Sequence, residues 1–235
     1  MEVSFGMLWG VVAVLASYIV GGFPTAIFAG KIIRGIDIRQ HGSRNAGATN
    51  VWRVLGAGPG LSVLLIDAGK GVLAVMGIAP LAVTLAGGVD ATGADYAAIL
   101  AILCGFGTIV GHIWTVWARF KGGKGVGTSA GVFFALAPWC GLAAFLTFAV
   151  TLAICRYVSL GSICAAFVLA SSAIIQSLTS YPTQLHPATA AIATIVATVV
   201  IVMHHGNISR LLNGTENRFG KPSSAAPTDS GEQSG

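Results

Sequence analysis

The sequence has very little charge, because only 9% of its 235 residues are Asp, Glu, Lys or Arg, whereas 54% are apolar. A soluble domain carries about 25% charged residues. The shortage excludes an ordinary soluble domain and indicates that most of the chain lies in lipid. A basic N-terminal segment is also missing, since residues 1–8 contain Glu2 but neither Lys nor Arg. We therefore expect the first apolar segment to remain as a helix and not to be cleaved as a signal peptide.

Cysteine is also scarce, and its spacing fits neither a metal site nor a redox pair. All four cysteines lie in or beside apolar segments, so we interpret them as small buried side chains. We expect no metal and no cofactor. The four positions are Cys104, Cys140, Cys155 and Cys164.

The basic residues gather in three segments, which hold eleven of the 13 Lys and Arg residues. By the positive-inside rule, all three segments face the cytoplasm. Residues 87–95 carry two Asp and no basic residue, as expected of an external loop. The basic excess thus reflects membrane orientation, and we expect no nucleic-acid partner. The three groups are Lys31, Arg34, Arg39, Arg44 and Arg53, then Arg119, Lys121 and Lys124, then Arg210, Arg218 and Lys221.

The apolar segments predict an all-α polytopic transmembrane helix bundle, with the first span at 7–30 and a polar loop at 31–56. Counting 126–154 as one span would put the C-terminal basic group outside, against the charge rule. Pro138 breaks the helical hydrogen-bond ladder and resolves the conflict by dividing this segment into 126–137 and 139–155. A re-entrant later segment is the alternative. The remaining predicted spans are 57–86, 97–118, 158–179 and 186–203.

This division gives about seven membrane helices, with the N-terminus outside and the C-terminus in the cytoplasm. Residues 1–221 read as a single membrane domain. Residues 222–235 are small, polar and proline-containing, so we expect a disordered tail without a functional role.

The first polar motif reads HGSRNAGATNVWRVLG and spans residues 41–56. Hydroxyl and amide side chains here can donate hydrogen bonds to an anion, and Arg53 offers a planar fork of donors that matches phosphate. A solvated turn with helix-capping Ser and Asn explains the same composition. The candidate ligand-binding side chains are Ser43, Asn45, Thr49, Asn50 and Arg53.

The second motif reads GHIWTVWARFKGGKGVGTSAG and spans residues 111–131. Glycines at 122, 123 and 125 let backbone N–H groups converge on an anion ahead of a helix N-terminus, and Lys124 adds a full charge. The spacing differs from a P-loop, because Gly125 follows the lysine. A flexible basic loop is the plainer interpretation, and phosphate binding by Gly122, Gly123, Lys124 and Gly125 is the favoured one. An interfacial histidine with satisfied hydrogen bonds is the favoured interpretation of His112, and a supporting place in the lining of this site is the alternative.

The third motif reads HHGNISRLLNGTENR and spans residues 204–218. His204, Asn207 and Arg210 are spaced at i, i+3 and i+6, which places them along one side of a helix. Glu216 lies beyond that helix. An ordinary amphipathic C-terminal helix would show the same pattern.

Two charged residues interrupt the second apolar segment. Asp67 and Lys70 are one helical turn apart, and a charge inside a bilayer is costly. We predict that they pair and face the bundle interior, as structural support first and as site residues second.

Five stretches in order resemble the PlsY family of membrane glycerol-3-phosphate acyltransferases. They are GSRNAGATNVWR, DAGKG at 67–71, GHIW with FKGGKGVGT, RYVSLGS at 156–162, and HHGNISRLLNGTE. The chain departs from the usual family pattern at Ala46, at Trp114-Thr115 and at His205. The resemblance runs from about residue 30 to residue 218.

The resemblance implies acyl transfer from acyl phosphate to the 1-hydroxyl of sn-glycerol 3-phosphate, the first acylation of phospholipid synthesis. It implies a multi-pass protein of the bacterial cytoplasmic (inner) membrane with its site on the cytoplasmic face. Membrane lipids and a soluble enzyme that makes acyl phosphate are further candidate partners. We assign substrate placement and charge stabilisation to Ser43, Arg53, Lys124, His204 and Asn207, with Arg210 and Glu216 in support. The base is His204 or, preferably, a substrate phosphate oxygen.

Two other classes of protein use similar residues. A carrier or channel for an organic phosphate would need polar groups near the midplane that both faces can reach. A non-catalytic lipid-binding scaffold would not need the glycine-rich loop with Lys124.

Overall fold

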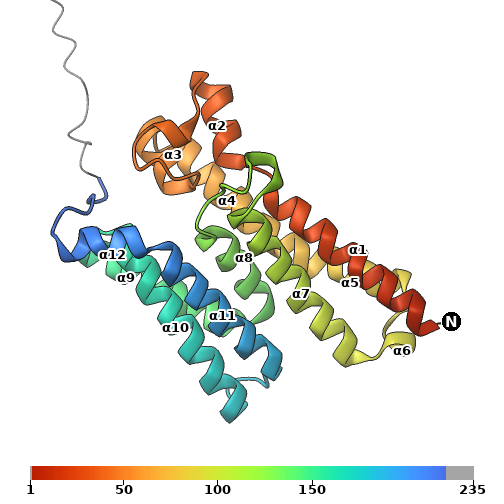
Figure 1. Cartoon of the computed structure of the whole chain (residues 1–235). Coiled ribbons are helices and arrows are strands. Elements are labelled where there is room, and N and C mark those ends of the chain that lie inside the picture. Colours follow the sequence, from red (N-terminus) through yellow and green to blue (C-terminus); the bar gives the residue numbers. More distant parts are fainter. Residues whose placement is uncertain (1, 221–235) are drawn as a thin grey trace, which may run out of the picture.

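The computed structural model describes residues 2–220, which are helical with no strand in that range. The predicted all-α fold is confirmed (Figure 1), whereas the predicted tail, residues 222–235, lies outside the described residues. A π-helical turn, η2 (Ala74–Ile78), joins α4 to α5, and two short 3-10 helices are η1 (Ile38–Gln40) and η3 (Val116–Ala118). The α-helices are α1 (Glu2–Gly22), α2 (Thr25–Arg34), α3 (Ala48–Leu55), α4 (Ala57–Leu73), α5 (Ala79–Leu85), α6 (Val89–Thr92), α7 (Ala94–Ile113), α8 (Val126–Leu136), α9 (Pro138–Cys155), α10 (Val158–Thr179), α11 (Pro187–Met203) and α12 (His205–Leu212).

Among the described residues, five helical segments are long and apolar enough to cross a membrane. The pair α11 and α12, bent by 56°, adds a sixth if it is counted as one span. These segments confirm a polytopic membrane protein. Helix α8 has only 11 residues, fewer than the ~20 that a crossing needs, so seven spans remain a prediction. The five segments are Gly6–Arg34, Ala57–Leu85, Ala94–Ala118, Pro138–Cys155 and Val158–Thr179.

The predicted division at Pro138 is confirmed as a helix break. Helix α8 ends at Leu136, Ala137 leaves the helical region with φ −145° and ψ 72°, and Pro138 opens α9. Proline suits the first position of a helix because the missing N–H would have no intrahelical partner there. The chain therefore reverses at this break, and α9 packs between α8 and α10.

The predicted polar loop at 31–56 is largely helical instead. Pro24 ends the first helix early, and α2 then continues through Arg34. Helix α3 follows after a turn and carries Arg53 in its last turn. An eight-residue helix is too short to show a clear hydrophobic period in the sequence, which explains the error.

Glycines allow two pairs of helices to touch backbone to backbone. A Cβ on Gly111 of α7 would lie 2.1 Å from the carbonyl oxygen of Tyr18 in α1. A Cβ on Gly131 of α8 would lie 1.9 Å from the carbonyl oxygen of Ala68 in α4. Small residues permit such close packing between membrane helices. The end of α7 and the start of α8, which flank residues 114–125, are therefore held against α1 and α4.

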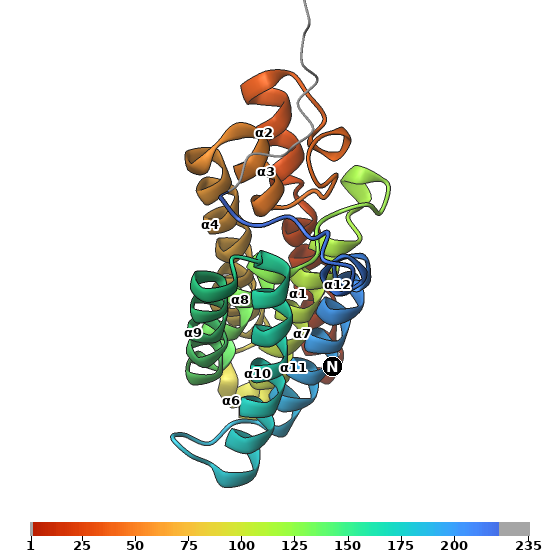
Figure 2. The same ribbon diagram turned by 90° about the vertical axis from the view of Figure 1, so that its left-hand side faces the viewer.

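The three basic segments lie at one end of the bundle. Figures 1 and 2 show α2, α3, the segment that contains η3, and α12 at this end, with the N-terminus and α6 at the other. The motifs predicted to share a face thus come together in space, whereas the assignment of that face to the cytoplasm stays a prediction.

Candidate active site

Asn50 organises the first motif from its centre. Its side chain is buried, with 1% exposed, and its Oδ1 accepts a hydrogen bond from the Ser43 N–H at 2.8 Å. Its amide nitrogen lies 3.0 Å from the carbonyl oxygens of Ile38, His41 and Asn45. The sequence predicts a phosphate ligand here. The structure instead uses the Asn50 amide to hold the turn closed, so we correct its role.

The rest of the first motif faces the polar end of the bundle. Ser43 is exposed on the turn that Asn50 holds, while Asn45 and Thr49 are half-buried beside it. Arg53 reaches the C-terminal segment, where its Nη2 donates to the Asn217 carbonyl oxygen at 3.4 Å. Burial lowers the pKa of Arg53, but arginine remains protonated in proteins. The first motif therefore brings a permanent positive charge to the third.

The glycine-rich loop uses its N–H groups within the chain. The Gly122 N–H donates to the Ile113 carbonyl at 3.0 Å, and the Gly123 N–H donates to the His112 carbonyl at 3.2 Å. These two amides therefore do not supply the phosphate donors that the sequence predicts. Glycine is required because a Cβ at Gly122 would lie 2.0 Å from the His112 carbonyl oxygen. The loop is tied to the end of α7, and Gly125 (φ 82°) leads it into α8.

Lys124 joins the second motif to the third. Its Nζ donates to Asn207 Oδ1, and Asn207 Nδ2 donates to Glu216 Oε1 at 2.7 Å. Arg210 Nε donates to the other carboxylate oxygen, Glu216 Oε2, at 2.8 Å. Ser159, at the start of α10, donates to Glu216 Oε1 at 3.0 Å. Ser159 has no predicted role, although it lies in the family-like stretch RYVSLGS.

The electrostatics of this cluster favour an anion. Burial lowers the pKa of Lys124 to about 8, Glu216 opposes the shift, and Arg210 and Arg53 add to it. Burial raises the pKa of Glu216, but hydrogen bonds from Asn207, Arg210 and Ser159 outweigh it and hold the pKa below the usual range. We call Arg53, Lys124, Arg210 and Glu216 the cationic cluster. Its three cations exceed its one carboxylate, so it suits a multiply charged phosphate.

His204 presents one free lone pair beside this cluster. Its side chain is 3% exposed, and its Nδ1 lies 2.7 Å from the Val200 carbonyl oxygen. A carbonyl oxygen only accepts, so Nδ1 carries the proton and Nε2 of the neutral ring is an acceptor. His204 can therefore take a hydrogen bond or a proton at Nε2.

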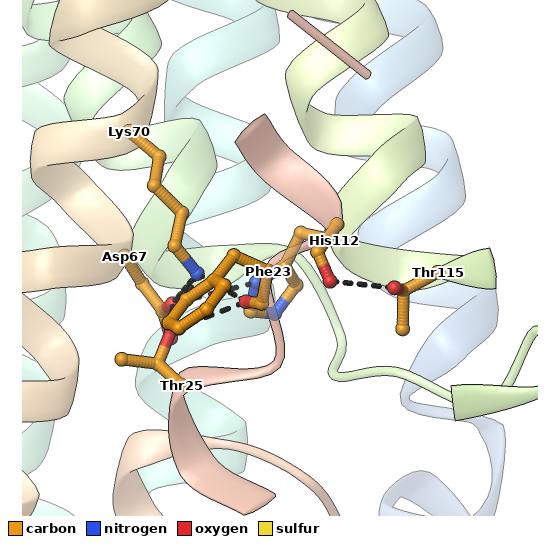
Figure 3. A network of polar contacts seen from close by, with 7 residues as sticks. Phe23, Thr25, Asp67, Lys70, His112 and Thr115 are labelled. Atoms are coloured by element: carbon orange, nitrogen blue, oxygen red, sulfur yellow. Dashed lines mark hydrogen bonds and ion pairs between the residues drawn. The ribbon is translucent and has the colours of Figure 1, made fainter. Parts of the chain in front are cut away.

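Asp67 and Lys70 form the predicted pair, and both side chains are buried in the bundle (Figure 3). Lys70 Nζ lies 2.7 Å from Asp67 Oδ1, 2.5 Å from Thr25 Oγ1 and 2.7 Å from the Phe23 carbonyl oxygen. These three acceptors use all three donors of the ammonium. Thr25 in turn donates to Asp67 Oδ1 at 2.7 Å, and His112 Nδ1 lies 3.7 Å from the same oxygen.

The fold and the cationic cluster together define a class of protein. An apolar helix bundle carries its buried charges and its three polar motifs at one end, which is typical of an integral membrane protein that acts on anions at one face. A carrier would need polar groups near the midplane that both faces can reach. A membrane-embedded enzyme fits this one-sided arrangement better.

Similarity to known proteins supports this class and identifies a family within it. The family model described as Glycerol-3-phosphate acyltransferase matches residues 11–214. A glycerol-3-phosphate acyltransferase of Salinibacter ruber is 38% identical over 222 residues, covering 90% of this chain and 93% of the relative. One of Synechococcus elongatus is 42% identical over 216 residues, covering 92% and 97%.

Solved structures show the same likeness. The crystal structure of PlsY, an integral membrane glycerol 3-phosphate acyltransferase, in its glycerol 3-phosphate form gives a TM-score of 0.72 at 32% identity, covering 90% of this chain and 96% of that one. The lysophosphatidic acid form gives 0.69 at 33% identity, covering 90% and 95%. The chain belongs to the glycerol-3-phosphate acyltransferase family, which confirms the resemblance inferred from the five motifs.

Proposed function

We propose that the chain transfers a fatty acyl group from acyl phosphate to the 1-hydroxyl of sn-glycerol 3-phosphate, giving lysophosphatidic acid and inorganic phosphate. This is the first acylation of phospholipid synthesis. The observation that carries the proposal is the convergence of Arg53, Lys124 and Arg210 around Glu216. Glycerol 3-phosphate is a phosphate ester and acyl phosphate is a mixed anhydride, so both need cationic side chains at the membrane surface to bind their phosphate groups. Relatives whose crystal forms are named for glycerol 3-phosphate and lysophosphatidic acid support the acceptor and the product.

The reaction needs no covalent intermediate on the protein. The 1-hydroxyl oxygen attacks the acyl carbon of the mixed anhydride, and the bond from that carbon to the phosphate oxygen breaks. Phosphate leaves with the bonding electrons, and the hydroxyl proton passes to a phosphate oxygen or to His204 Nε2. We favour the phosphate oxygen. Lys124 and Arg53 stabilise the charge that develops on the leaving group, while Ser43 and Asn207 orient the substrates.

An apolar groove offers a place for the acyl chain. It is lined by Phe145, Phe148 and Leu152 of α9 together with Phe219. The Phe219 ring lies 5.3 Å from the ring of Trp52, the residue before Arg53. The groove therefore approaches the cationic cluster, so a donor can place its chain in apolar surroundings and its phosphate among the cations.

The sidedness of the site follows from the charge distribution. The basic segments lie at one end of the bundle, and the positive-inside rule assigns that end to the cytoplasmic side of the bacterial inner membrane. Soluble glycerol 3-phosphate is then reached directly from the water, and a soluble enzyme that makes acyl phosphate can approach the same face. This one-sided placement also disfavours a phosphate carrier.

The test uses purified protein in lipid nanodiscs with acyl phosphate and labelled glycerol 3-phosphate. We expect lysophosphatidic acid and inorganic phosphate in equal amounts, without any added thioester. A parallel reaction with acyl-coenzyme A tests the donor, and product formed with that donor alone would contradict acyl phosphate as the donor. Uptake of glycerol 3-phosphate into proteoliposomes without product would favour the carrier instead.

A further inference from the structure

The pair of Asp67 and Lys70 lies where the chain breaks between α1 and α2. Pro24 interrupts the helix, and the Phe23 carbonyl then accepts from both the Thr25 N–H and Lys70 Nζ. The side chains of Lys70 and Asp67 are only 6% and 5% exposed, and Thr25 is buried beside them. The network thus fastens α4 to the start of α2 (Figure 3).

His112 lies between this network and the glycine-rich loop. Its Nδ1 faces Asp67 Oδ1 at 3.7 Å, so the two side chains are in close contact although the distance is longer than a hydrogen bond. On its other side, Nε2 packs so closely on Gly123 that an added Cβ would lie 2.3 Å away. The backbone carbonyl of His112 also accepts the Gly123 N–H at 3.2 Å. Lys124 is the next residue, so the place of its backbone depends on His112.

A small cavity shows that these parts adjoin one another. Thr25, Asp67, His112 and Gly123 line it, together with Ala46 of the first motif. The network, the imidazole and two of the three motifs therefore share one wall. A shift of the imidazole would be transmitted to the glycine-rich loop through direct contact.

We propose that Asp67 is a positioning residue that holds the His112 imidazole against Gly123 and thereby fixes the location of Lys124. Lys70 and Thr25 hold the Asp67 carboxylate in turn. The inference rests on the proposed function, in which Lys124 binds a substrate phosphate. It extends the site inward from the three motifs to the break between α1 and α2.

Stability alone does not explain the pair. A buried ion pair loses so much hydration that apolar residues of similar size often serve the fold as well or better. Removing one partner is damaging, because the other charge is then left buried and unpaired. The informative variant therefore replaces both charges together, as in the double variant Asp67→Leu/Lys70→Met.

The experiment compares the wild type with this double variant in nanodiscs. We expect a Tm close to that of the wild type and at least a tenfold lower kcat/KM for acyl transfer. Gln176→Leu is the matched control, because it removes a buried polar side chain that bonds Thr183 at the other end of α10. It should lower the Tm and leave kcat/KM of the folded protein unchanged. A folded double variant with wild-type kcat/KM would overturn the proposal.

A double-mutant cycle tests the route through His112. Gly123→Ala pushes the imidazole away from the glycine-rich loop. This change should lower kcat/KM much less in the double variant than in the wild type, because Asp67 no longer holds the ring in the double variant. If the losses in kcat/KM are additive, the two changes act independently, and the proposed route through His112 is wrong. If the double variant does not fold, Thr25→Val replaces it, since that change removes only the hydroxyl between Asp67 and Lys70 and must still lower kcat/KM.

The reactivity of Lys124 supplies a readout that does not depend on activity. The neutral amine of Lys124, formed when its ammonium loses a proton, should react with an amine-modifying reagent with a midpoint near pH 8, and mass spectrometry would follow the modification. In the double variant, a displaced Lys124 should react with a midpoint nearer the ordinary 10.5. If the midpoint is the same in the double variant, Asp67 does not position Lys124, whether or not the wild type transfers acyl groups. If the wild type shows no acyl transfer, only the proposed function is contradicted.

Discussion

The charge of Lys124 should set the upper pH limit of the reaction. Burial lowers the pKa of Lys124 from 10.5 to about 8, so the ammonium is present below that pH and is lost above it. Because kcat/KM reports groups of the free enzyme, it should fall by roughly tenfold from its plateau by about pH 9. A bound phosphate dianion stabilises the ammonium, so kcat should fall only at a higher pH than kcat/KM.

Two substitutions separate charge from shape at this position. Lys124→Ala should lower kcat/KM by about a hundredfold or more, the scale seen when one preorganised donor is removed, and should abolish the alkaline fall. Lys124→Arg keeps a charge throughout the tested range and should also abolish the fall, with reduced activity because a planar fork does not match the Asn207 acceptor.

The assay measures initial rates of lysophosphatidic acid formation between about pH 6 and pH 10 at constant ionic strength. The second ionisation of the substrate phosphates falls near pH 6, so it does not interfere with the alkaline limb. A wild-type kcat/KM that stays constant to about pH 9.5 would refute the reasoning. Near-normal rates in a correctly inserted Lys124→Ala protein would do the same.

Three further outcomes can be measured. Glu216→Gln should lower the Tm and the folded yield, because it removes the carboxylate that offsets three cations; an unchanged Tm would count against that role. Gly131→Val should separate α4 from α8 and destabilise the protein, since a Cβ there meets the Ala68 carbonyl oxygen at 1.9 Å, whereas Gly58→Ala, which meets open space, should be tolerated. Single cysteines in the three basic segments should resist external labelling in intact cells, and labelling of any one would reverse its predicted side. These cysteines replace Arg39, Lys121 and Arg218.

The membrane fold can be predicted from the sequence, whereas the exact number and bounds of the spans cannot. Low charge and long apolar runs identify the bundle, and Pro138 places the break because proline cannot continue a helix. The number of spans does not follow, since composition says nothing of how the short α8 lies in the bilayer. Helix α3 escapes prediction because its polar, glycine-flanked residues resemble a loop.

The sequence predicts which charged residues gather in the candidate site, but it does not predict the hydrogen bonds that they and their neighbours form. The positive-inside rule predicts that Lys124 and Arg210 share one end of the bundle, and in the structure Arg210 lies near enough to lower the pKa of Lys124. The sequence shows which groups can donate but not which are already used, so Asn50 and Gly123 are misassigned. Thr25 is missed because a lone hydroxyl in an apolar stretch has no distinguishing spacing.

The position of Glu216 also bears on how the protein is made. This residue accepts hydrogen bonds that bind Asn207 and Arg210, yet it follows all the apolar segments in the order of synthesis. Arg53 and Lys124 enter the growing chain well before the carboxylate that offsets their charge. The cationic cluster can therefore be completed only after α1 to α11 have been synthesised, and a chain truncated before Glu216 would lack the carboxylate that offsets its three cations.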